Sequence, residues 1–327
     1  GEGSGEEVLR LPKGESVREV AIRLSYPDEV VEWMMGEFGA KETLRVLEAG
    51  NSIPAMMLRS RGKTPADWSL ASVDLADKVP ELNEGIAASS VANVPKVGIV
   101  DSHEAITSCF SDFAVQNATV VSLFSYAAVS LCERTGAPSK ILDLCAAPGS
   151  KTALLADVFT EADITANDIA EYKLRTLRDT MARFGLDERV KCVSKKVEEL
   201  LPDCESASHA EAERFDLIIV DPPCSNSGLF SRRAEARWRL DSQNVLNAFK
   251  SSQTHLLTAA ARSLADDSAT EIWYTTSSIL QAENDEVVNE VCDAEGLTVA
   301  WKKLVLPDDA GWDGGFIACL RRDSPSP

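Results

Sequence analysis

Apolar and polar positions divide the chain into two regions of different pattern. From about residue 111 onward, short apolar runs recur between segments of helical periodicity. The apolar runs, read as strands, are Lys140–Leu144, Ile164–Asp168, Val190–Val193, Phe215–Asp221, Glu271–Thr276, Leu297–Val305 and Gly315–Leu320. A polar insertion between Asp203 and Arg214 is expected to be a surface loop. The alternation predicts an α/β fold, with a doubly wound, mostly parallel sheet of seven strands.

The first 110 residues follow another pattern and carry no chemical motif. Helical spacing covers Val30–Phe38 and Lys41–Ala49, and a strand-like run follows at Ala55–Arg59. Prolines and glycines punctuate the next stretch, with prolines at Pro65, Pro80 and Pro95. We therefore predict a smaller α+β domain over residues 1–110 and a larger domain over residues 111–327.

An uncharged stretch joins the two regions. Residues Val115 to Cys132 hold no charged side chain, but they include Gln116, Asn117 and three serines. Polar groups at this density argue against a membrane span. The stretch is predicted to be part of a long buried helix at about Phe113–Arg134.

The net charge is strongly negative. The chain has 33 Lys and Arg against 52 Asp and Glu, which gives −19 at pH 7 with histidine neutral. A protein that coats nucleic acid or anionic membrane needs the opposite balance, because Lys and Arg neutralise the phosphates. Any contact with nucleic acid must therefore be local. Residues Gly1–Glu7 lack the basic and apolar regions of a secretory signal, so a cytoplasmic protein is expected.

The cysteine spacing indicates neither a metal site nor a disulfide framework. No Cys-x-x-Cys pair occurs, and no histidine stands at ligand spacing. Reduced thiols in a cytosol fit this spacing best. The eight cysteines are Cys109, Cys132, Cys145, Cys192, Cys204, Cys224, Cys292 and Cys319.

The first strand of the predicted sheet ends in a turn of small residues, Cys145-Ala146-Ala147-Pro148-Gly149-Ser150. In open α/β sheets, ligands bind beyond the carboxyl ends of the strands. Small side chains let a ligand approach the backbone, and Gly149 permits the dihedral angles of a tight turn. Asp168, 25 residues after Asp143, ends the next strand and can accept hydrogen bonds from ribose hydroxyls. The alternative is an ordinary turn with a solvated Asp; the GxxxxGK[ST] pattern of a phosphate-binding loop is absent.

The fourth strand ends in Asp221-Pro222-Pro223-Cys224. Two prolines give the chain a rigid exit from the strand, which suits a site that clamps a flat base. The carboxyl of Asp221 can bond a ring nitrogen or an exocyclic amine, and a thiolate at Cys224 would be a potent nucleophile. The alternative for any single cysteine is a buried, inert thiol.

A basic run follows this corner. Four arginines and a tryptophan fall within nine positions, Ser231-Arg232-Arg233-Ala234-Glu235-Ala236-Arg237-Trp238-Arg239. Arginine binds phosphates and tryptophan stacks on bases, although a solvated charged helix has the same composition. A second basic cluster is Lys191, Lys195 and Lys196.

Together these motifs resemble the Sun/Fmu/RsmB-like RNA cytosine-C5 methyltransferases. The central matches are Leu142–Thr152, Asp221–Ser225 with Gly228, Arg232-Arg233 and Arg237–Arg239. Further matches are Leu24–Trp33, Ala55–Arg61, Val115–Asn117, Glu283–Glu286 and Asp313–Ala318. The resemblance covers about residues 11 to 322, and its two central motifs are specific in combination.

The resemblance implies a class I, Rossmann-like methyltransferase that transfers a methyl group from S-adenosylmethionine to carbon 5 of cytosine in RNA, expected to be ribosomal. In that chemistry a cysteine thiolate adds to carbon 6 of an unstacked base. The implied cofactor residues are Cys145, Ala146, Ala147, Pro148, Gly149, Ser150, Lys151 and Asp168, with Asp221 contacting both cofactor and base. Cys224 is expected to assist release of the adduct. RNA contacts are expected at Arg232, Arg233, Arg237 and Trp238 of a monomer without metal or membrane partner.

The chain departs from the family at the attacking thiol. The family has Tyr-Ser-Thr-Cys-Ser at the end of strand five, and this chain has Tyr274-Thr275-Thr276-Ser277-Ser278. A thiol is a few per cent ionised at pH 7, whereas an alcohol is ionised far less unless a base takes its proton. The three histidines lie outside the matched motifs. Ser277 is therefore not expected to perform the addition.

Three interpretations stay open. Ser277 replaces Cys in an otherwise complete enzyme; or Cys224 attacks, as the matching Cys does in DNA cytosine-C5 methyltransferases; or the chain is a catalytically silent RNA-binding relative, such as a ribosome assembly factor. A small-molecule methyltransferase is a weaker option. A second departure is Ser194-Lys195-Lys196, where the family has an acid near the adenine.

Overall fold

The computed structural model describes residues 11–54, 56–60, 71–72, 97–100, 118–120, 122, 125–127, 129, 137–201, 213–240, 242–267 and 269–322. The prolines Pro65, Pro80 and Pro95, most of the insertion from Asp203, and Cys109, Cys132 and Cys204 lie outside these residues.

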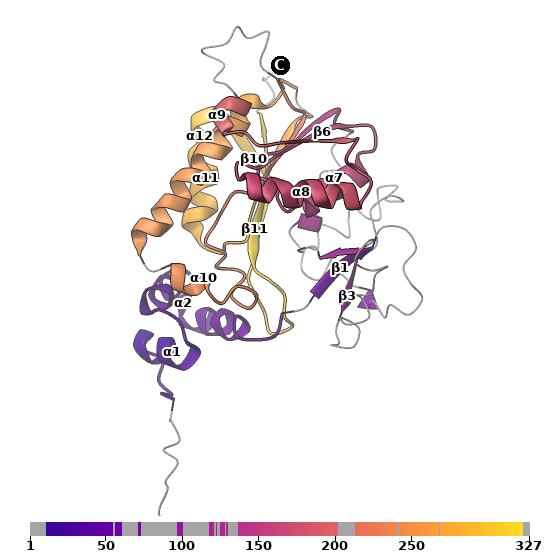
Figure 1. Ribbon diagram of the computed structural model, residues 1–327. Coiled ribbons are helices and arrows are strands. Elements are labelled where there is room, and N and C mark those ends of the chain that lie inside the picture. The colour runs from indigo at the N-terminus through magenta and orange to yellow at the C-terminus, as the bar shows by residue number, and fades with distance from the viewer. Residues whose placement is uncertain are drawn as a thin grey trace, which may run out of the picture.

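A seven-stranded sheet forms the centre of the fold (Figure 1). The strands are β5 (Lys140–Asp143), β6 (Asp163–Asn167), β7 (Val190–Val193), β8 (Leu217–Val220), β9 (Glu271–Thr276), β10 (Leu297–Val305) and β11 (Gly315–Arg322). Their order is β10-β11-β9-β8-β5-β6-β7, with β5 to β9 parallel and β10 and β11 antiparallel. The predicted doubly wound, mostly parallel sheet is confirmed, and the strand bounds agree within two residues.

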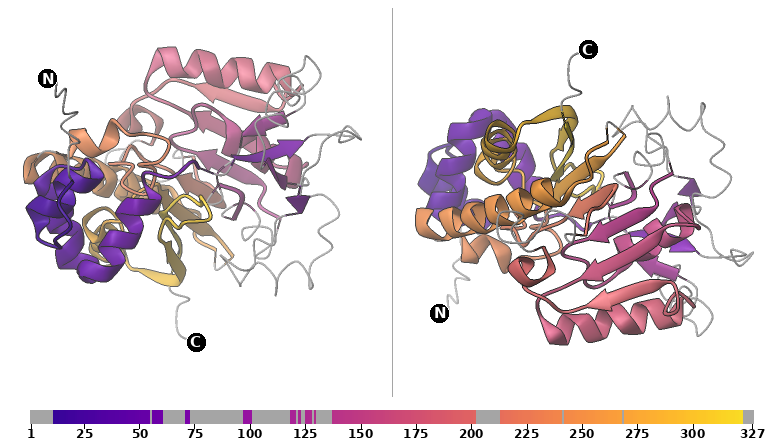
Figure 2. Two further views of the ribbon diagram at one scale, coloured as in Figure 1. Left: turned by 90° about the horizontal axis from the view of Figure 1, so that it is seen from below. Right: turned by 90° about the horizontal axis from the view of Figure 1, so that it is seen from above.

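Helices cover both faces of this sheet (Figure 2). All four residues of β8 are buried, and their side chains alternate between two apolar clusters. Leu217 and Ile219 pack on one face, and Ile218 and Val220 pack on the other. The helices are α7 (Ser150–Val158) and α8 (Glu171–Arg183) on the first face, and α11 (Gln243–Ser263) and α12 (Asp285–Glu295) on the second. A strand buried on both faces explains the continuous apolar runs in the sequence.

The N-terminal part contributes two helices and a small sheet. The helices are α1 (Val17–Leu24) and α2 (Asp28–Ala49), and the strands are β1 (Met56–Ser60), β2 (Ala71–Ser72), β3 (Val97–Val100) and β4 (Ala118–Val120). A break at Gly39, with φ 77°, divides α2 into the two helices that the sequence predicts. The strand predicted at Ala55–Arg59 is β1, and the antiparallel sheet has the order β2-β3-β1-β4.

The helix predicted over Phe113–Arg134 is wrong in its first half. Ala118–Val120 forms β4, which pairs with β1, and helical residues are described only at 125–127 and 129. The absence of charge indicated burial, but burial suits a strand as well as a helix. The β-branched Thr119 and Val120 favour the strand once β1 offers its edge. The smaller sheet thus includes a strand beyond residue 110, and the domain division at that residue stays a prediction.

The N-terminal helices share an apolar core with segments far along the chain. Tyr26 packs edge-on against Phe230, with ring centroids 5.4 Å apart. Other residues of this core include Val30, Met34, Val46 and Leu47 from α2, and Ala236, Leu240, Ile279 and Leu280 from the larger domain. Figure 1 shows α2 against α10 (Ala236–Arg239), which carries the end of the basic run. The helices therefore support the loops that leave β8 and β9.

Arg237 is buried within this core and stabilises it. Its side chain is 5% exposed and lies 4.0 Å from the centre of the Tyr26 ring. The guanidinium donates hydrogen bonds to the carbonyls of Gly50 and Phe230 (3.1 and 3.3 Å) and to the side chain of Asn51 (2.9 Å). Arg237 is predicted to contact RNA, but its guanidinium is buried and is hydrogen-bonded between two parts of the fold.

The turn from β5 into α7 is held by a glycine and by a buried carboxyl group. Gly149 has φ 106°, and a Cβ there would lie 2.8 Å from Leu177 Cδ1, so only glycine fits. Asp143 is fully buried and accepts a hydrogen bond from Thr152 Oγ1 at 2.7 Å. Burial raises the pKa of Asp143 to about 6, against the opposing effects of Thr152 and the Lys151 charge.

Replacing Arg237 tests the link between the N-terminal helices and the larger domain. Arg237→Ala leaves buried carbonyls without a donor, and we expect it to lower the free energy of unfolding by roughly 2–4 kcal/mol in urea titrations. Arg239→Ala is the matched control, because its side chain is 64% exposed, and a change within about 0.5 kcal/mol is expected. Equal effects of the two variants would contradict the role given to Arg237.

Replacing Asp143 tests the buried carboxyl through pH. A pKa raised from 3.8 to about 6 means that the stability contributed by Asp143 is present below pH 4 and is lost as pH rises through 6. The unfolding free energy of Asp143→Asn, minus that of wild type, should therefore grow by about 2–3 kcal/mol between pH 4 and 7. Asp163→Asn, at the exposed start of β6, is the control and should show no such growth. A difference for Asp143→Asn that does not vary with pH would refute the assignment.

Candidate active site

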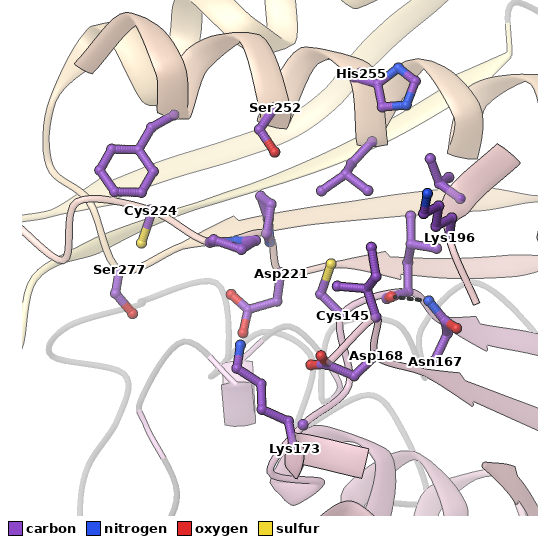
Figure 3. Close-up of a pocket in the computed structure, with 18 of the residues that line it drawn as sticks. Cys145, Asn167, Asp168, Lys173, Lys196, Asp221, Cys224, Ser252, His255 and Ser277 are labelled. Carbon is purple, nitrogen blue, oxygen red and sulfur yellow. Dashed lines mark hydrogen bonds between the residues drawn. The ribbon is translucent and has the colours of Figure 1, made fainter. Parts of the chain in front are cut away.

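A cavity of about 710 Å³ opens where the parallel strands end (Figure 3). One wall comes from the turn after β5 and the ends of β6 and β7, and the other from α11. Its floor is formed by the corner after β8 and the residue after β9. The cavity therefore stands where ligands bind in doubly wound sheets.

The turn after β5 presents part of the predicted cofactor set to the cavity. Cys145, Ala147, Asp168 and Asp221 line it, and Asp168 is 6% exposed. The remaining predicted residues shape the turn: Ala146 and Gly149 are buried, Pro148 is exposed, and Ser150 and Lys151 begin α7. Burial, followed by the charges of Asp221 and Asp143, raises the pKa of the Cys145 thiol well above its usual range. Cys145 therefore lines the cavity as a protonated thiol.

Asn167 is a cavity residue that the sequence reasoning missed. It ends β6, and its side chain donates to the Leu144 carbonyl (3.2 Å) and accepts from the Lys195 amide (3.0 Å). It thus ties together the ends of β5, β6 and β7. Its place directly before Asp168, at the carboxyl end of the strand, was a signal that could have identified it.

The second departure from the family lies on the same wall. Lys195 and Lys196 line the cavity and are exposed, and Ser194 bonds the Ile169 carbonyl at 3.3 Å. Lys173 reaches into the cavity from α8 (Figure 3). Where the resemblance expects one acid near the adenine, the structure therefore has Lys195 and Lys196, and Lys173 adds a third ammonium group to the cavity.

Asp221 links the turn after β5 to the corner after β8. Its Oδ2 accepts from Lys151 Nζ at 2.6 Å, and its Oδ1 accepts from Thr275 Oγ1 at 3.1 Å. Lys151, predicted to belong to the cofactor-binding residues, forms an ion pair with Asp221. The pair fixes the carboxylate at the floor of the cavity.

Cys224 and Ser277 lie together at one end of the cavity (Figure 3). The pKa of Cys224 is raised to about 12 by burial and by the charges of Glu283 and Asp221, while backbone hydrogen bonds from Asn226 and Ser277 lower it. Among the described residues, the Ser277 hydroxyl has no hydrogen-bond partner that could take its proton. His255, across the cavity on α11, bonds Glu198 at 2.9 Å. Neither nucleophile is activated in this arrangement.

The basic run divides into three environments. Arg233 and Arg239 line the cavity mouth with exposed side chains, and Trp238 is 59% exposed. Arg232 bonds both oxygens of Asp313, at 2.7 and 2.9 Å. Arg237 is buried, as described above, and Arg239, which the site prediction left out, takes its place at the mouth.

Neither a metal centre nor a membrane helix is found in the described part of the chain. No three His, Cys, Asp or Glu side chains there are grouped to hold a metal ion. None of the helices described is long and apolar enough to cross a membrane.

Comparison with known proteins places the chain. Residues 135–321, more than half of the chain, match the family model for 16S rRNA methyltransferase RsmB/F. A ribosomal RNA small subunit methyltransferase B from Photorhabdus laumondii is 28% identical over 198 residues, which are 56% of this chain and 42% of that protein. The chain thus spans less than half the length of such curated relatives.

Solved structures share the fold over nearly the whole chain. A methyltransferase homologue from Pyrococcus horikoshii has a TM-score of 0.68 with 19% identity, and covers 95% of this chain and 100% of its own. NSun6 from the same organism, solved with SFG, has a TM-score of 0.65 with 15% identity, and covers 91% and 99%. These likenesses confirm the class I methyltransferase fold. Together with the family match, they show that the chain belongs to the 16S rRNA methyltransferase RsmB/F family.

Proposed function

We propose that this chain binds S-adenosylmethionine and ribosomal RNA, and that it methylates carbon 5 of cytosine with Cys224 as the attacking thiol. The observation that carries the proposal is the meeting of Asp221, Cys224 and Ser277 at one end of a cavity whose wall is the turn after β5. The family uses S-adenosylmethionine, and relatives are named for ribosomal RNA.

The cavity residues fit this cofactor. A volume of about 710 Å³ lies within the usual range for small-molecule sites. Asp168 can accept bonds from ribose hydroxyls, and Ile169 and Leu256 offer apolar contact to a flat base. Asp143 Oδ1 is buried beneath the turn and has no hydrogen bond from a described residue. When bound, S-adenosylmethionine supplies a methyl group on a positively charged sulfur.

The proposed reaction begins at Cys224. The thiol would lose its proton to solvent, and the thiolate would bond to carbon 6 while the electrons of the 5,6 double bond move to carbon 5. Carbon 5 would then take the methyl group, whose bonding electrons stay on the cofactor sulfur. The carbon 5 proton then leaves to solvent, and the sulfur–carbon 6 electrons return to Cys224 as the double bond re-forms. With a pKa of about 12, only on the order of one thiol in 10⁴–10⁵ is ionised at pH 7.5, so the first step is slow.

A catalytically silent RNA-binding protein, such as a ribosome assembly factor, is the second candidate. The observation that favours it is the same high pKa at Cys224, together with a hydroxyl at Ser277 that no described base contacts. In that case the cavity would bind cofactor and base without forming a covalent bond.

RNA is proposed to enter at the cavity mouth. Arg233 and Arg239 can pair with phosphates, and Trp238 can stack on a base. The residues before 110, with α1, α2 and most of the small sheet, are proposed as a further RNA-binding part. The protein is proposed to act as a cytoplasmic monomer.

The nucleophile is tested with RNA that contains 5-fluorocytosine, because fluorine at carbon 5 blocks release and traps the covalent adduct. We expect wild type with S-adenosylmethionine to form an adduct that survives denaturation, and Cys224→Ala to reduce it at least tenfold. Cys292→Ala, which removes a thiol from the distant core, should leave the adduct unchanged. Adduct yield is measured on denaturing gels and by mass spectrometry.

The same assay with Ser277→Cys separates the two candidates. A protein that forms no adduct as wild type but gains one with Ser277→Cys is a silent relative that lacks only the thiol. An adduct that survives Cys224→Ala in the wild-type background would exclude Cys224 as the nucleophile.

The RNA path is tested by charge reversal at the mouth. Arg233→Glu with Arg239→Glu should weaken binding of a single-stranded ribosomal RNA fragment and reduce the salt dependence of log Kd by about 0.7 for each lost phosphate contact. Each single variant, Arg233→Glu and Arg239→Glu, is compared with Arg262→Glu, which makes the same charge change at the far end of α11. If the mouth variants bind RNA as Arg262→Glu does, the mouth is not the RNA path.

A further inference from the structure

Glu283 is a buried carboxylate that lies behind the cavity. Its side chain is fully buried at the end of a short 3-10 helix, Gln281–Glu283. It accepts hydrogen bonds from the Ser225 amide (2.8 Å), the Ser225 hydroxyl (2.5 Å), the Ser278 hydroxyl (2.5 Å) and Gln253 Nε2 (2.9 Å). Burying a charge is costly unless it is hydrogen-bonded, so four donors on one carboxylate indicate a built arrangement.

The donors come from the segments that carry the two candidate nucleophiles. Ser225 directly follows Cys224, and Ser278 directly follows Ser277. The two serine oxygens also lie 3.2 Å apart. One carboxylate therefore joins the corner after β8 to the loop after β9.

Gln253, the third residue that donates to Glu283, lies on α11. Gln253 is fully buried, and its amide nitrogen bonds the Pro223 carbonyl (3.0 Å) as well as Glu283. The corner is thus held on both sides of Cys224, at Pro223 and at Ser225. Glu283 is the group on which the β8 corner, the β9 loop and α11 converge.

We propose that Glu283 is a positioning residue, which holds Cys224 in place beside Ser277. The inference deepens the proposed function, because it concerns the same site. The carboxylate does not line the cavity and so acts through Ser225 and Ser278 rather than on a bound base.

The placement also sets the charge around the thiol. Glu283 from the 3-10 helix and Asp221 from the end of β8 face Cys224, and both raise its pKa. Tyr274 of β9 lies close by, hydrogen-bonded through its hydroxyl to the Glu283 carbonyl at 2.7 Å. Asp221 is itself paired with Lys151. Glu283 therefore fixes the thiol and, together with burial, keeps it protonated at rest.

The test measures alkylation of Cys224 by iodoacetamide from pH 6.5 to 10, with each cysteine followed as a peptide by mass spectrometry. It uses the full chain and needs neither cofactor nor RNA, so its outcome is independent of whether the protein methylates RNA. Glu283→Gln removes the charge but keeps an oxygen that can accept from the Ser225 amide and Gln253. Glu286→Gln, three residues along and exposed, makes the same chemical change away from the corner.

We expect Glu283→Gln to raise the rate at Cys224 roughly tenfold at pH 8, with the profile moved to lower pH, since a fall of one in pKa gives about tenfold more thiolate. Glu283→Ala should raise the alkylation rate at Cys224 further, because the corner after β8 then loses the carboxylate that holds it. Glu286→Gln should match wild type. The buried Cys292 and Cys319 should stay unreactive in every variant.

Two results would overturn the proposal. An unchanged Cys224 profile in Glu283→Gln and Glu283→Ala would show that the carboxylate does not place the thiol. A parallel rise at Cys224, Cys292 and Cys319 would show general loss of structure instead. Ser225→Ala provides a second test, because it removes the hydroxyl donor to Glu283 and nothing else. If the two residues act together, the effects of Ser225→Ala and Glu283→Ala on the alkylation rate of Cys224 are non-additive in the double variant.

Discussion

The parallel run of the central strands is the constraint on which the site depends. β5, β6, β8 and β9 point the same way, so their carboxyl ends meet at one edge of the sheet. Residues 78 positions apart in the chain, Asp143 and Asp221, therefore end neighbouring strands. The ion pair of Lys151 with Asp221 then joins the turn after β5 to the corner after β8.

Three loops at this edge are held in place by backbone contacts as well as by Glu283. The Gly228 amide bonds the Ser277 carbonyl at 2.9 Å, and the Gly314 amide bonds the Gly228 carbonyl at 2.8 Å. A Cβ on Gly228 would collide with the Gly314 carbonyl, so glycine is required by the close approach of the two backbones. The Arg232–Asp313 pair joins the same loops through side chains. The nucleophile end of the cavity is consequently rigid, while the mouth carries exposed arginines.

The charge of the protein is unevenly distributed around the cavity. The chain is acidic overall, yet lysines on one wall of the cavity and arginines at its mouth form a basic rim around the acidic floor. A net charge of −19 opposes indiscriminate binding of nucleic acid, and the rim is the place proposed for contact with RNA. Burial, Glu283 behind the cavity and Asp221 in its floor together raise the pKa of Cys224.

The amino-acid sequence by itself determined the sheet, the turn after β5, the corner after β8 and the serine at position 277, where the resemblance expects a thiol, because each depends on local pattern or residue identity. Only the tertiary structure decided which arginines face outward: Arg237 and Arg239 are two residues apart in one short helix, and one is buried against Tyr26 while the other lines the cavity. It also decided that Ala118–Val120 is a strand, that Lys151 pairs with Asp221, and that Glu283 braces Cys224. These outcomes depend on partners distant in sequence, which burial and hydrogen bonding select only once the chain has folded.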